Sequence, residues 1–290
     1  MKKVLIKRLQ TFWPPSAAKL LRNPAAEDLK GMSEVGVIIV DYLSDPLLES
    51  TLVSLSTAVG DLHLKIVVVE NRPRRIHRNI PKNLDIHFLT QEKNLGFGRA
   101  VNLARQQLHT SYLFILNPDI QVFQNTISIL HDFMKKNSRV GLVVPKLLDL
   151  KGNVQASARN FYDLPTIFFR RTFLGKLFPN HQRLRDHLMA DWDHSTIREI
   201  DWALGACMMI RTEAVPDEVF DPRFFLYFED VDLCLRFKKA GWKVVYHPEA
   251  IAIHEHRQKS RKNPFSRANY EHFKSWIKFI LKYRNISGIE

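Results

Sequence analysis

The segment FLYFEDVDLCLRF, residues 225–237, places three carboxylates, Glu229, Asp230 and Asp232, among aromatic and aliphatic side chains. An ionised carboxylate buried among apolar neighbours costs several kcal/mol unless a partner compensates its charge. The same surroundings raise the pKa of a carboxyl group, which suits a general base that accepts a proton near neutral pH. A second interpretation stays open, because acids also favour the first turn of a helix and Asp232 can pair with Arg236 four residues later.

Polar residues also follow an apolar segment that is expected to be a strand. SYLFIL, residues 111–116, runs into Asn117-Pro118-Asp119, and Pro118 must end the strand because it has no N–H to donate. An acid held at that point, such as Asp119, is suited to bind Mg²⁺ or Mn²⁺ together with substrate phosphates. The alternative is a simple turn formed by Asn117 and Asp119.

Two glycines and a histidine complete the candidate residues. Gly96 and Gly98 lie at the start of a helix in NLGFGRAVN, residues 94–102, where the backbone can approach a ligand and the helix N-terminus attracts phosphate. The pattern matches neither the dinucleotide fingerprint nor the P-loop, and Arg99 would face either phosphate or solvent. His254 follows the strand-like run IAI, where a neutral imidazole suits a divalent metal, although a single histidine is more often structural.

The elements that must position these side chains alternate between strand and helix in the first half of the chain. Apolar runs predict strands at residues 35–40, 65–71, 85–89, 111–116 and 140–145. Three helices are expected: one begins at Asp45-Pro46, and the other two cover residues 94–108 and 126–136. Because the strands are apolar throughout, we expect a parallel sheet with helices on both faces. Such sheets bind ligands at the carboxyl ends of their strands, which singles out Glu70, Asn71 and Asn117 to Asp119.

The second half of the chain is less regular. Residues 147–158 predict a hairpin, residues 200–203, 206–210, 243–247 and 251–256 predict strands, and a helix is expected from Glu229 to Ala240, with Gly241 as its stop signal. The simplest division is an N-terminal extension over residues 1–33, one domain over residues 34–264 and a C-terminal amphipathic helix over residues 265–290.

The composition is that of a globular protein with a basic surface. Hydrophobic residues make up 45% of the 290 residues, charged residues make up 25%, and the net charge is +13. This charge attracts nucleic acid, anionic lipid or phosphorylated substrates, but the sequence carries no recognised nucleic-acid-binding signature. No apolar run approaches the roughly 18 residues of a membrane span, and two cysteines argue against a disulfide framework. We therefore expect a soluble intracellular protein.

The C-terminal segment NYEHFKSWIKFILKYRN combines apolar and basic positions at helical spacing. The apolar stripe consists of Phe273, Ile277, Ile280 and Leu281, and the basic stripe consists of Lys274, Lys278 and Lys282. Such a helix can lie in a lipid interface, where each cation near an anionic leaflet contributes roughly 1 kcal/mol. Packing of the apolar stripe on the core is the alternative.

Taken in order, these segments resemble the family 2 inverting glycosyltransferases, and among them the bacterial rhamnosyltransferase-like group that builds cell-surface polysaccharides. The resemblance covers roughly residues 35–284 and is carried by VGVIIVDY, VVVEN, NLGFGRAVN, LFILNPD, DWALGACMMIR, FDPRFFLYFEDVDLCLR and GWKVVYHPEAIAIHEH. It implies the GT-A fold, an α/β Rossmann-like, mainly parallel sheet flanked by helices, with a smaller antiparallel portion. Residues 34–145 would form the nucleotide-sugar half and residues 146–264 the acceptor half.

The resemblance also implies catalytic and metal-binding roles. Asp230 matches the catalytic base in the family's ED motif, and Glu229 would orient it or contact the acceptor. Asp119 matches the last acid of the metal-binding DxD motif, and His254 matches a histidine that can complete the metal or diphosphate site. A divalent metal, Mg²⁺ or Mn²⁺, is therefore implied. One departure is that Asn117 replaces the first acid of DxD, which leaves fewer carboxylates for the metal.

Further positions would contact the nucleotide-sugar donor and the acceptor. Glu70 matches an acid, more often Asp, that contacts the nucleoside at the end of the second strand. The residues assigned to the donor are Glu70, Asn71, Asn94, Gly96, Gly98, Arg99 and Asn117, and those assigned to the sugar and acceptor pocket are Trp202, Gly205 and Ala206.

The chemistry implied by the resemblance is a single displacement with inversion, in which Asp230 takes a proton from an acceptor hydroxyl that attacks the anomeric carbon. The favoured donor is dTDP-rhamnose, and the favoured acceptor is a lipid-linked or lipopolysaccharide-type glycan at the anionic inner face of the cytoplasmic membrane. No nucleic-acid partner is expected. The alternatives are a UDP-sugar donor on the same fold, or a weakly catalytic scaffold that binds anionic lipid or nucleic acid through its basic surface.

Overall fold

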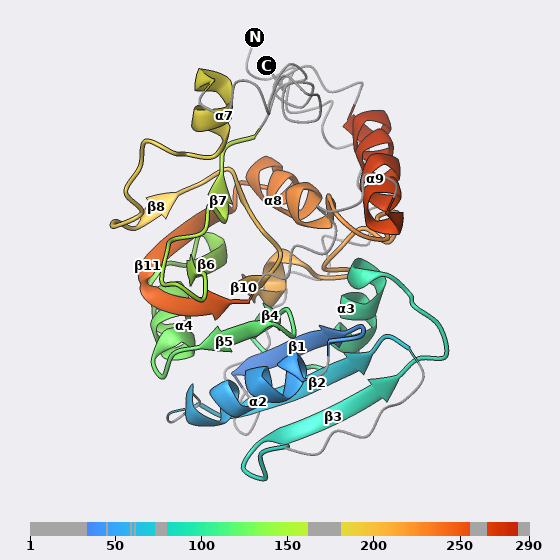
Figure 1. Ribbon diagram of the computed structural model, residues 1–290. Coiled ribbons are helices and arrows are strands. Elements are labelled where there is room, and N and C mark those ends of the chain that lie inside the picture. Colours follow the sequence, from blue (N-terminus) through green and yellow to red (C-terminus); the bar gives the residue numbers. More distant parts are fainter. Residues whose placement is uncertain are drawn as a thin grey trace, which may run out of the picture. The chain divides into compact units, whose positions relative to one another are not determined.

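The computed structural model describes residues 34–44, 46–58, 60, 62–72, 80–161, 181–255 and 266–283 (Figure 1). The chain divides into two units, Met1–Met32 and Ser33–Glu290, and all described residues belong to the second unit. The predicted extension of residues 1–33 therefore lies outside the described residues.

A sheet of nine strands forms the centre of the described part of the chain (Figure 1). Its strands are β1 (Val35–Asp41), β2 (Leu64–Glu70), β3 (Asp85–Thr90), β4 (Tyr112–Leu116), β5 (Ile120–Val122), β6 (Val140–Leu148), β8 (Arg198–Glu199), β10 (Cys207–Arg211) and β11 (Lys243–His254). The order is β3-β2-β1-β4-β10-β6-β11-β5, and β8 pairs with β11. The first four strands in this order are mutually parallel, as are β6 and β11, whereas β10, β5 and β8 run antiparallel to their neighbours. Two short strands, β7 (Ala158–Arg159) and β9 (Trp202–Ala203), form a separate pair.

Helices cover both faces of the sheet. They are α2 (Leu47–Ala58), α3 (Phe97–Arg105), α4 (Thr126–Lys136), α7 (Gln182–His187), α8 (Glu229–Lys239) and α9 (Arg267–Tyr283), with a 3-10 turn η2 (Thr212–Ala214). The alternation of side chains along each strand divides the core into two clusters. One cluster joins one sheet face to α2 and α4, and the other joins the opposite face to α3, α8 and the inner side of α9. Both cysteines are free and buried, one in each cluster.

The predicted fold class is confirmed: the protein is a mixed α/β structure with a mostly parallel central sheet between helices. The five strands expected in the first half, β1, β2, β3, β4 and β6, run in the same direction as expected, but β10 from the second half lies antiparallel between β4 and β6. The reason is the path of the chain. After β9 it enters β10 at the carboxyl edge of the sheet, where Cys207 pairs with Leu116 at the end of β4, so that β10 runs back across the sheet.

Two predictions for the second half were wrong in detail. Residues 147–158 do not form a regular hairpin, since a single bridge between Leu148 and Val154 closes a tight turn. The two strands expected at residues 243–247 and 251–256 are one strand, β11, with an irregularity between His247 and Ile251. Pro248 lies within that irregularity and has no N–H for the ladder, which explains why the sequence looked interrupted.

Helix α9 packs with a different face from the one expected. Glu271, Ser275, Phe279 and Tyr283 are buried at a spacing of four residues. Ile280, which was assigned to the apolar stripe, packs against the core, whereas Tyr270, Phe273, Ile277 and Leu281 are exposed. Within the described residues, no helix combines the length and the apolarity needed to cross a membrane.

Candidate active site

A strained turn sets the position of Glu229 and Asp230. Helix α8 begins at Glu229, and the two preceding residues, Tyr227 and Phe228, have φ angles of 68° and 67°. A non-glycine residue in this left-handed region costs on the order of 1–3 kcal/mol and persists only where its surroundings impose it. We call residues 227–230 the catalytic turn.

Helices α9 and α3 hold the catalytic turn from two sides. From α9, Phe279 packs on Phe228 with ring centroids 5.4 Å apart, and the Ser275 hydroxyl donates to the Leu226 carbonyl at 2.9 Å. From α3, the Phe97 N–H donates to the Phe225 carbonyl at 2.9 Å. These contacts fix the backbone that delivers the two acids.

Asp230 is held as a hydrogen-bond acceptor. Its Oδ2 accepts from the Gly205 N–H at 3.0 Å, and its Oδ1 accepts from the Val231 N–H at 2.9 Å. Burial raises the pKa of Asp230, while these two N–H groups and the positive charge of Arg159 act in the opposite direction. The result is an ionisable oxygen of raised basicity beside a fixed donor, which suits a general base.

The neighbouring acid, Glu229, is also buried and also has a raised pKa. Its side chain is buried, and its Oε2 atom receives no hydrogen bond from any described residue. Burial, followed by the nearby charge of Asp230, raises the pKa of Glu229 to about 8. Burial therefore raises the pKa of both adjacent acids, and of the two it is Asp230 that accepts from the Gly205 N–H.

Asp232 is a structural acid. It is fully buried and accepts from Arg236 Nε at 3.0 Å and from the Tyr283 hydroxyl at 2.7 Å, with Lys282 as a third partner. The predicted pairing of Asp232 with Arg236 is thus confirmed. Lys282 also contacts Asp221 at 2.7 Å, so this lysine points inward and is not part of a basic outer stripe.

Asp119 and His254 come together at the carboxyl edge of the sheet. His254 ends β11 opposite Ile120 of β5, and the Glu255 N–H donates to the Asp119 carbonyl at 2.9 Å. His254 Nε2 lies 3.5 Å from Asp119 Oδ1, and this oxygen is buried without a hydrogen bond from any described residue.

The side-chain atoms at this point are suitable ligands for a divalent cation. A carboxylate oxygen and an imidazole nitrogen at this separation are suitable ligands for Mn²⁺ or Mg²⁺, and Asp119 Oδ1 has no other use in the described structure. The described residues contain no cluster of three or more acidic, histidine or cysteine ligands. Substrate phosphates and water would therefore have to supply the remaining ligands.

Acidic residues also end the first strands of the sheet. Asp41 in β1, Glu70 in β2 and Thr90 in β3 are register partners at the carboxyl edge, and the Thr90 hydroxyl donates to Glu70. Arg72 Nη2 lies 3.9 Å from Asp41 Oδ2. These residues form the donor edge, a polar row that is buried except for Thr90 and that can meet a nucleoside and its phosphates.

The predicted donor residues Asn71 and Asn94 interact with each other. Asn71 Nδ2 donates to Asn94 Oδ1 at 2.9 Å, and Asn71 Oδ1 accepts from the Leu95 N–H at 2.8 Å. The same Asn94 oxygen accepts from the Gly96 N–H at 2.8 Å. The two amides therefore fix the segment between β2 and α3, and this local role accounts for both side chains.

Gly96, just before α3, and Gly98, within α3, both lie close to neighbouring protein atoms. Gly96 has φ +84°, and a Cβ atom there would lie 2.4 Å from the Phe225 carbonyl oxygen. A Cβ at Gly98 would lie 3.0 Å from Phe220 Cβ. Arg99, expected to face phosphate or solvent, is exposed and donates to the Pro222 carbonyl at 2.9 Å. The segment that suggested a phosphate site thus supports the chain that leads to the catalytic turn.

Two consecutive residues connect Asp230 with the Asn117–Asp119 segment. The Gly205 N–H donates to Asp230, and the carbonyl of the next residue, Ala206, accepts from the Asn117 N–H at 2.8 Å. Trp202, three residues before Gly205, is buried, and its Nε1 donates to the Asn160 carbonyl at 3.1 Å. The catalytic turn and the Asn117–Asp119 segment therefore belong to one site.

Four residues of this site were not predicted. Asp41 could have been found, because it ends the apolar run VGVIIV just as Glu70 ends β2. Arg72 directly follows Glu70 and Asn71 in the sequence. Gln155, which contacts His254, and Arg159, whose guanidinium lies 5.0 Å from the ring centroid of Trp202, come from a segment without a periodic pattern.

The protein combines a mostly parallel sheet with acidic side chains at the carboxyl ends of its strands. A family model described as "Glycosyltransferase like family 2" matches residues 33–270, and the chain belongs to this family.

Two curated relatives resemble most of the chain. N-acetylglucosaminyl-diphospho-decaprenol L-rhamnosyltransferase of Mycobacterium tuberculosis is 29% identical over 260 residues, which cover 83% of this chain and 82% of the relative. Rhamnosyltransferase WbbL of Escherichia coli K12 is 24% identical over 263 residues, which cover 88% of this chain and 95% of the relative.

Solved structures share the fold. GalNAc-T7 with UDP, GalNAc and Mn²⁺ superposes with a TM-score of 0.58 at 15% identity over 88% of this chain, which spans 50% of the GalNAc-T7 chain. TarS of S. aureus superposes with a TM-score of 0.50 at 13% identity over 88% of this chain and 44% of its own. These likenesses concern the fold alone.

Proposed function

We propose that the protein is an inverting glycosyltransferase that moves L-rhamnose from dTDP-rhamnose to a hydroxyl group of a lipid-linked glycan. The observation that carries the proposal is Asp230, whose oxygen is fixed by the Gly205 N–H and joined through Gly205-Ala206 to the segment of Asp119. The names of the relatives favour rhamnose as the sugar.

The geometry supports separate roles for the donor edge and for Asp230. The donor edge, with Asp41, Glu70 and Arg72, would bind the nucleoside diphosphate. Asp230 would accept the proton of the acceptor hydroxyl as its oxygen attacks the anomeric carbon from the face opposite the leaving nucleotide. Glu229, neutral at pH 7, keeps a second negative charge away from the base. Removal of such a base typically lowers the rate by about 10²–10⁴.

A divalent cation is part of the proposal. Asp119 and His254 would hold it, and its role would be to neutralise the charge that develops on the departing diphosphate. Asn117 stands where the family motif has an acid, so the protein would contribute one carboxylate from this motif.

A lipid-linked acceptor is supported by one relative and by the outer face of α9. The M. tuberculosis relative is named for a diphospho-decaprenol substrate. On α9, the exposed residues Tyr270, Phe273, Ile277 and Leu281 lie along one side, and Lys274 borders them. An apolar strip of this kind beside a lysine fits the interface of an anionic membrane. We therefore place the protein at the inner surface of the cytoplasmic membrane.

A transfer assay tests the proposal. The purified protein is incubated with GlcNAc-diphospho-polyprenol and either dTDP-rhamnose or a UDP-sugar, with Mn²⁺, with Mg²⁺ or with EDTA. A rhamnosyl product that requires dTDP-rhamnose and a metal, with an inverted anomeric centre by NMR, is the expected result. Turnover only with a UDP-sugar would replace the donor. Absence of turnover together with absence of nucleotide binding would favour the scaffold alternative.

A further inference from the structure

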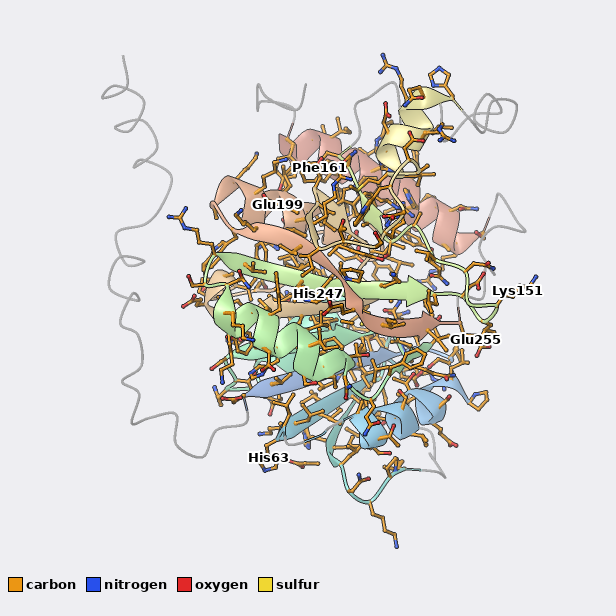
Figure 2. All side chains as sticks on the ribbon, turned by 90° about the vertical axis from the view of Figure 1, so that its left-hand side faces the viewer. His63, Lys151, Phe161, Glu199, His247 and Glu255 are labelled. Carbon is orange, nitrogen blue, oxygen red and sulfur yellow. The ribbon has the colours of Figure 1, made fainter. Side chains whose placement is uncertain are left out.

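Gln155 occupies a fixed position beside the proposed cation site. It follows a turn in which Asp149 Oδ1 accepts from the N–H groups of Lys151 and Asn153, each at 2.8 Å. The Gln155 N–H then donates to the Leu147 carbonyl at 2.8 Å. Figure 2 shows Lys151, in this turn, and Glu255, next to His254, toward the same side of the molecule. The turn therefore brings Gln155 to the end of β11.

The amide of Gln155 contacts His254 through both of its polar atoms. Gln155 Nε2 donates to the His254 carbonyl at 2.9 Å, and Gln155 Oε1 lies 2.9 Å from His254 Nδ1. The first contact decides how the amide is oriented, because a carbonyl oxygen can only accept and must face the NH₂ group. Oε1 is then the atom that faces the imidazole, and as an acceptor it requires a proton on Nδ1.

This orientation determines the tautomer of the histidine. A neutral imidazole with its proton on Nδ1 has a lone pair on Nε2, and Nε2 is the nitrogen that lies 3.5 Å from Asp119 Oδ1. A lone pair and a carboxylate oxygen repel each other unless a positive group lies between them. The arrangement therefore presents two ligand atoms to a cation, and partners of this kind orient metal-bound histidines generally.

We propose that Gln155 is the positioning residue of this cation site: it sets the Nδ1-protonated tautomer of His254 and aims Nε2 at the cation shared with Asp119. The inference rests on the cation site of the proposed function and adds a residue that the metal does not touch. Gln155 acts through His254 and is not a catalytic residue.

The first test reads the tautomer without metal or substrate. ¹⁵N NMR of the imidazole nitrogens, at a pH where His254 is neutral, distinguishes a protonated from an unprotonated nitrogen. In the wild-type protein we expect the proton of His254 on Nδ1, and in Gln155→Leu a mixture of tautomers. A wild-type proton on Nε2, or an unchanged tautomer in Gln155→Leu, would overturn the proposal.

The second test measures Mn²⁺ binding by EPR in the presence of dTDP. Loss of a residue that orients a ligand typically weakens metal affinity by about 10–100-fold, which we expect for Gln155→Leu. Gln155→Glu keeps an acceptor for Nδ1–H but loses the bond to the His254 carbonyl, so it should retain the Mn²⁺ affinity. Gln107→Leu makes the same change at an exposed position and should match the wild type.

The two tests separate the inference from the proposed function. Equal loss of Mn²⁺ affinity in Gln155→Leu and Gln155→Glu would show a packing role and overturn the inference. So would a matching loss of metal-free dTDP binding in Gln155→Leu. If the wild-type protein binds no Mn²⁺ with dTDP, the metal part of the proposed function fails, while the tautomer measurement still decides the role of Gln155.

Discussion

The donor edge and the catalytic turn belong to the same site, but different kinds of structure position them. Asp41 and Glu70 are the last residues of buried parallel strands, so the regular register of the sheet places them side by side. Glu229 and Asp230 follow two residues in the left-handed region, and helices from distant parts of the chain impose that conformation. Strand ends provide a polar binding edge at little cost in folding free energy, whereas a base of raised pKa needs a strained and buried position. Substitutions around the base should therefore have larger effects than substitutions on exposed surfaces, and four variants test this difference.

The largest effect is expected at the base itself. Asp230→Asn keeps the size of the side chain and its contact with Gly205 but cannot accept the proton, so kcat should fall by about 10²–10⁴. Binding of dTDP, measured by calorimetry, should remain within a factor of a few because the donor edge is untouched. Unchanged turnover would remove Asp230 from the mechanism.

A smaller but still large effect is expected where Lys282 of α9 is bonded to Asp232 of α8. Lys282→Met leaves buried Asp232 with Arg236 and Tyr283 as its remaining partners. Loss of one partner of a buried ion pair costs about 3–5 kcal/mol, and we expect roughly 2 kcal/mol here because two partners remain. Chemical denaturation measures the difference. Lys278→Met is the matched control, because Lys278 is bonded to the Arg223 carbonyl, and an equal loss there would contradict the prediction.

The pH dependence of stability should reveal that Glu229 is buried as a neutral acid. Its pKa is raised to about 8 in the folded state, above the ordinary value of 4.5, so the folded protein binds more protons than the unfolded chain between these pH values. The free energy of unfolding should therefore decrease as the pH rises through this window. In Glu229→Gln this component is absent and the decrease should be shallower. Denaturation curves at several pH values give the comparison, and identical slopes would mean that Glu229 is not buried as a neutral acid.

The smallest effect on stability is expected on the outer side of α9. Replacing Phe273, Ile277 and Leu281 with Ser alters exposed side chains and should change the unfolding free energy by no more than about 0.5 kcal/mol for each site. Flotation with anionic vesicles should nevertheless show a clear loss of binding. Retained binding would place the membrane contact elsewhere or show that it does not exist.

Several parts of the fold and the site were accessible from local patterns. The helix expected at residues 126–136 is α4, and the strand expected at residues 35–40 is β1 with one residue added. Asp119 and Glu70 were recognised because each follows or ends a buried apolar run, and Asp230 because acids were crowded by aromatic residues. Hydrophobic periodicity and strand ends are properties of neighbouring residues, so they can be seen without a structure.

Other parts depended on partners far away in the sequence. Gln155 and His254 are 99 residues apart, and nothing around Gln155 distinguishes it from an ordinary polar residue after a turn. The same distance problem applies to Arg99, which was expected to face phosphate or solvent and is exposed, but also donates to the carbonyl of Pro222, 123 positions later. It also explains Lys282, which looked like part of a surface stripe and is bonded to an acid 50 residues earlier.

The sequence by itself determined the alternation of strands and helices, the acids that follow the strands and the segment that carries the base, because these follow from short-range patterns of apolar and polar residues. The tertiary structure alone decided that Glu229 and Asp230 are both buried with raised pKa values and that Asp230 accepts from the Gly205 N–H. It also decided which face of α9 is covered and which nitrogen of His254 meets Asp119. Solvent exclusion and hydrogen-bond direction depend on what packs against a residue, and packing is settled only when distant segments meet.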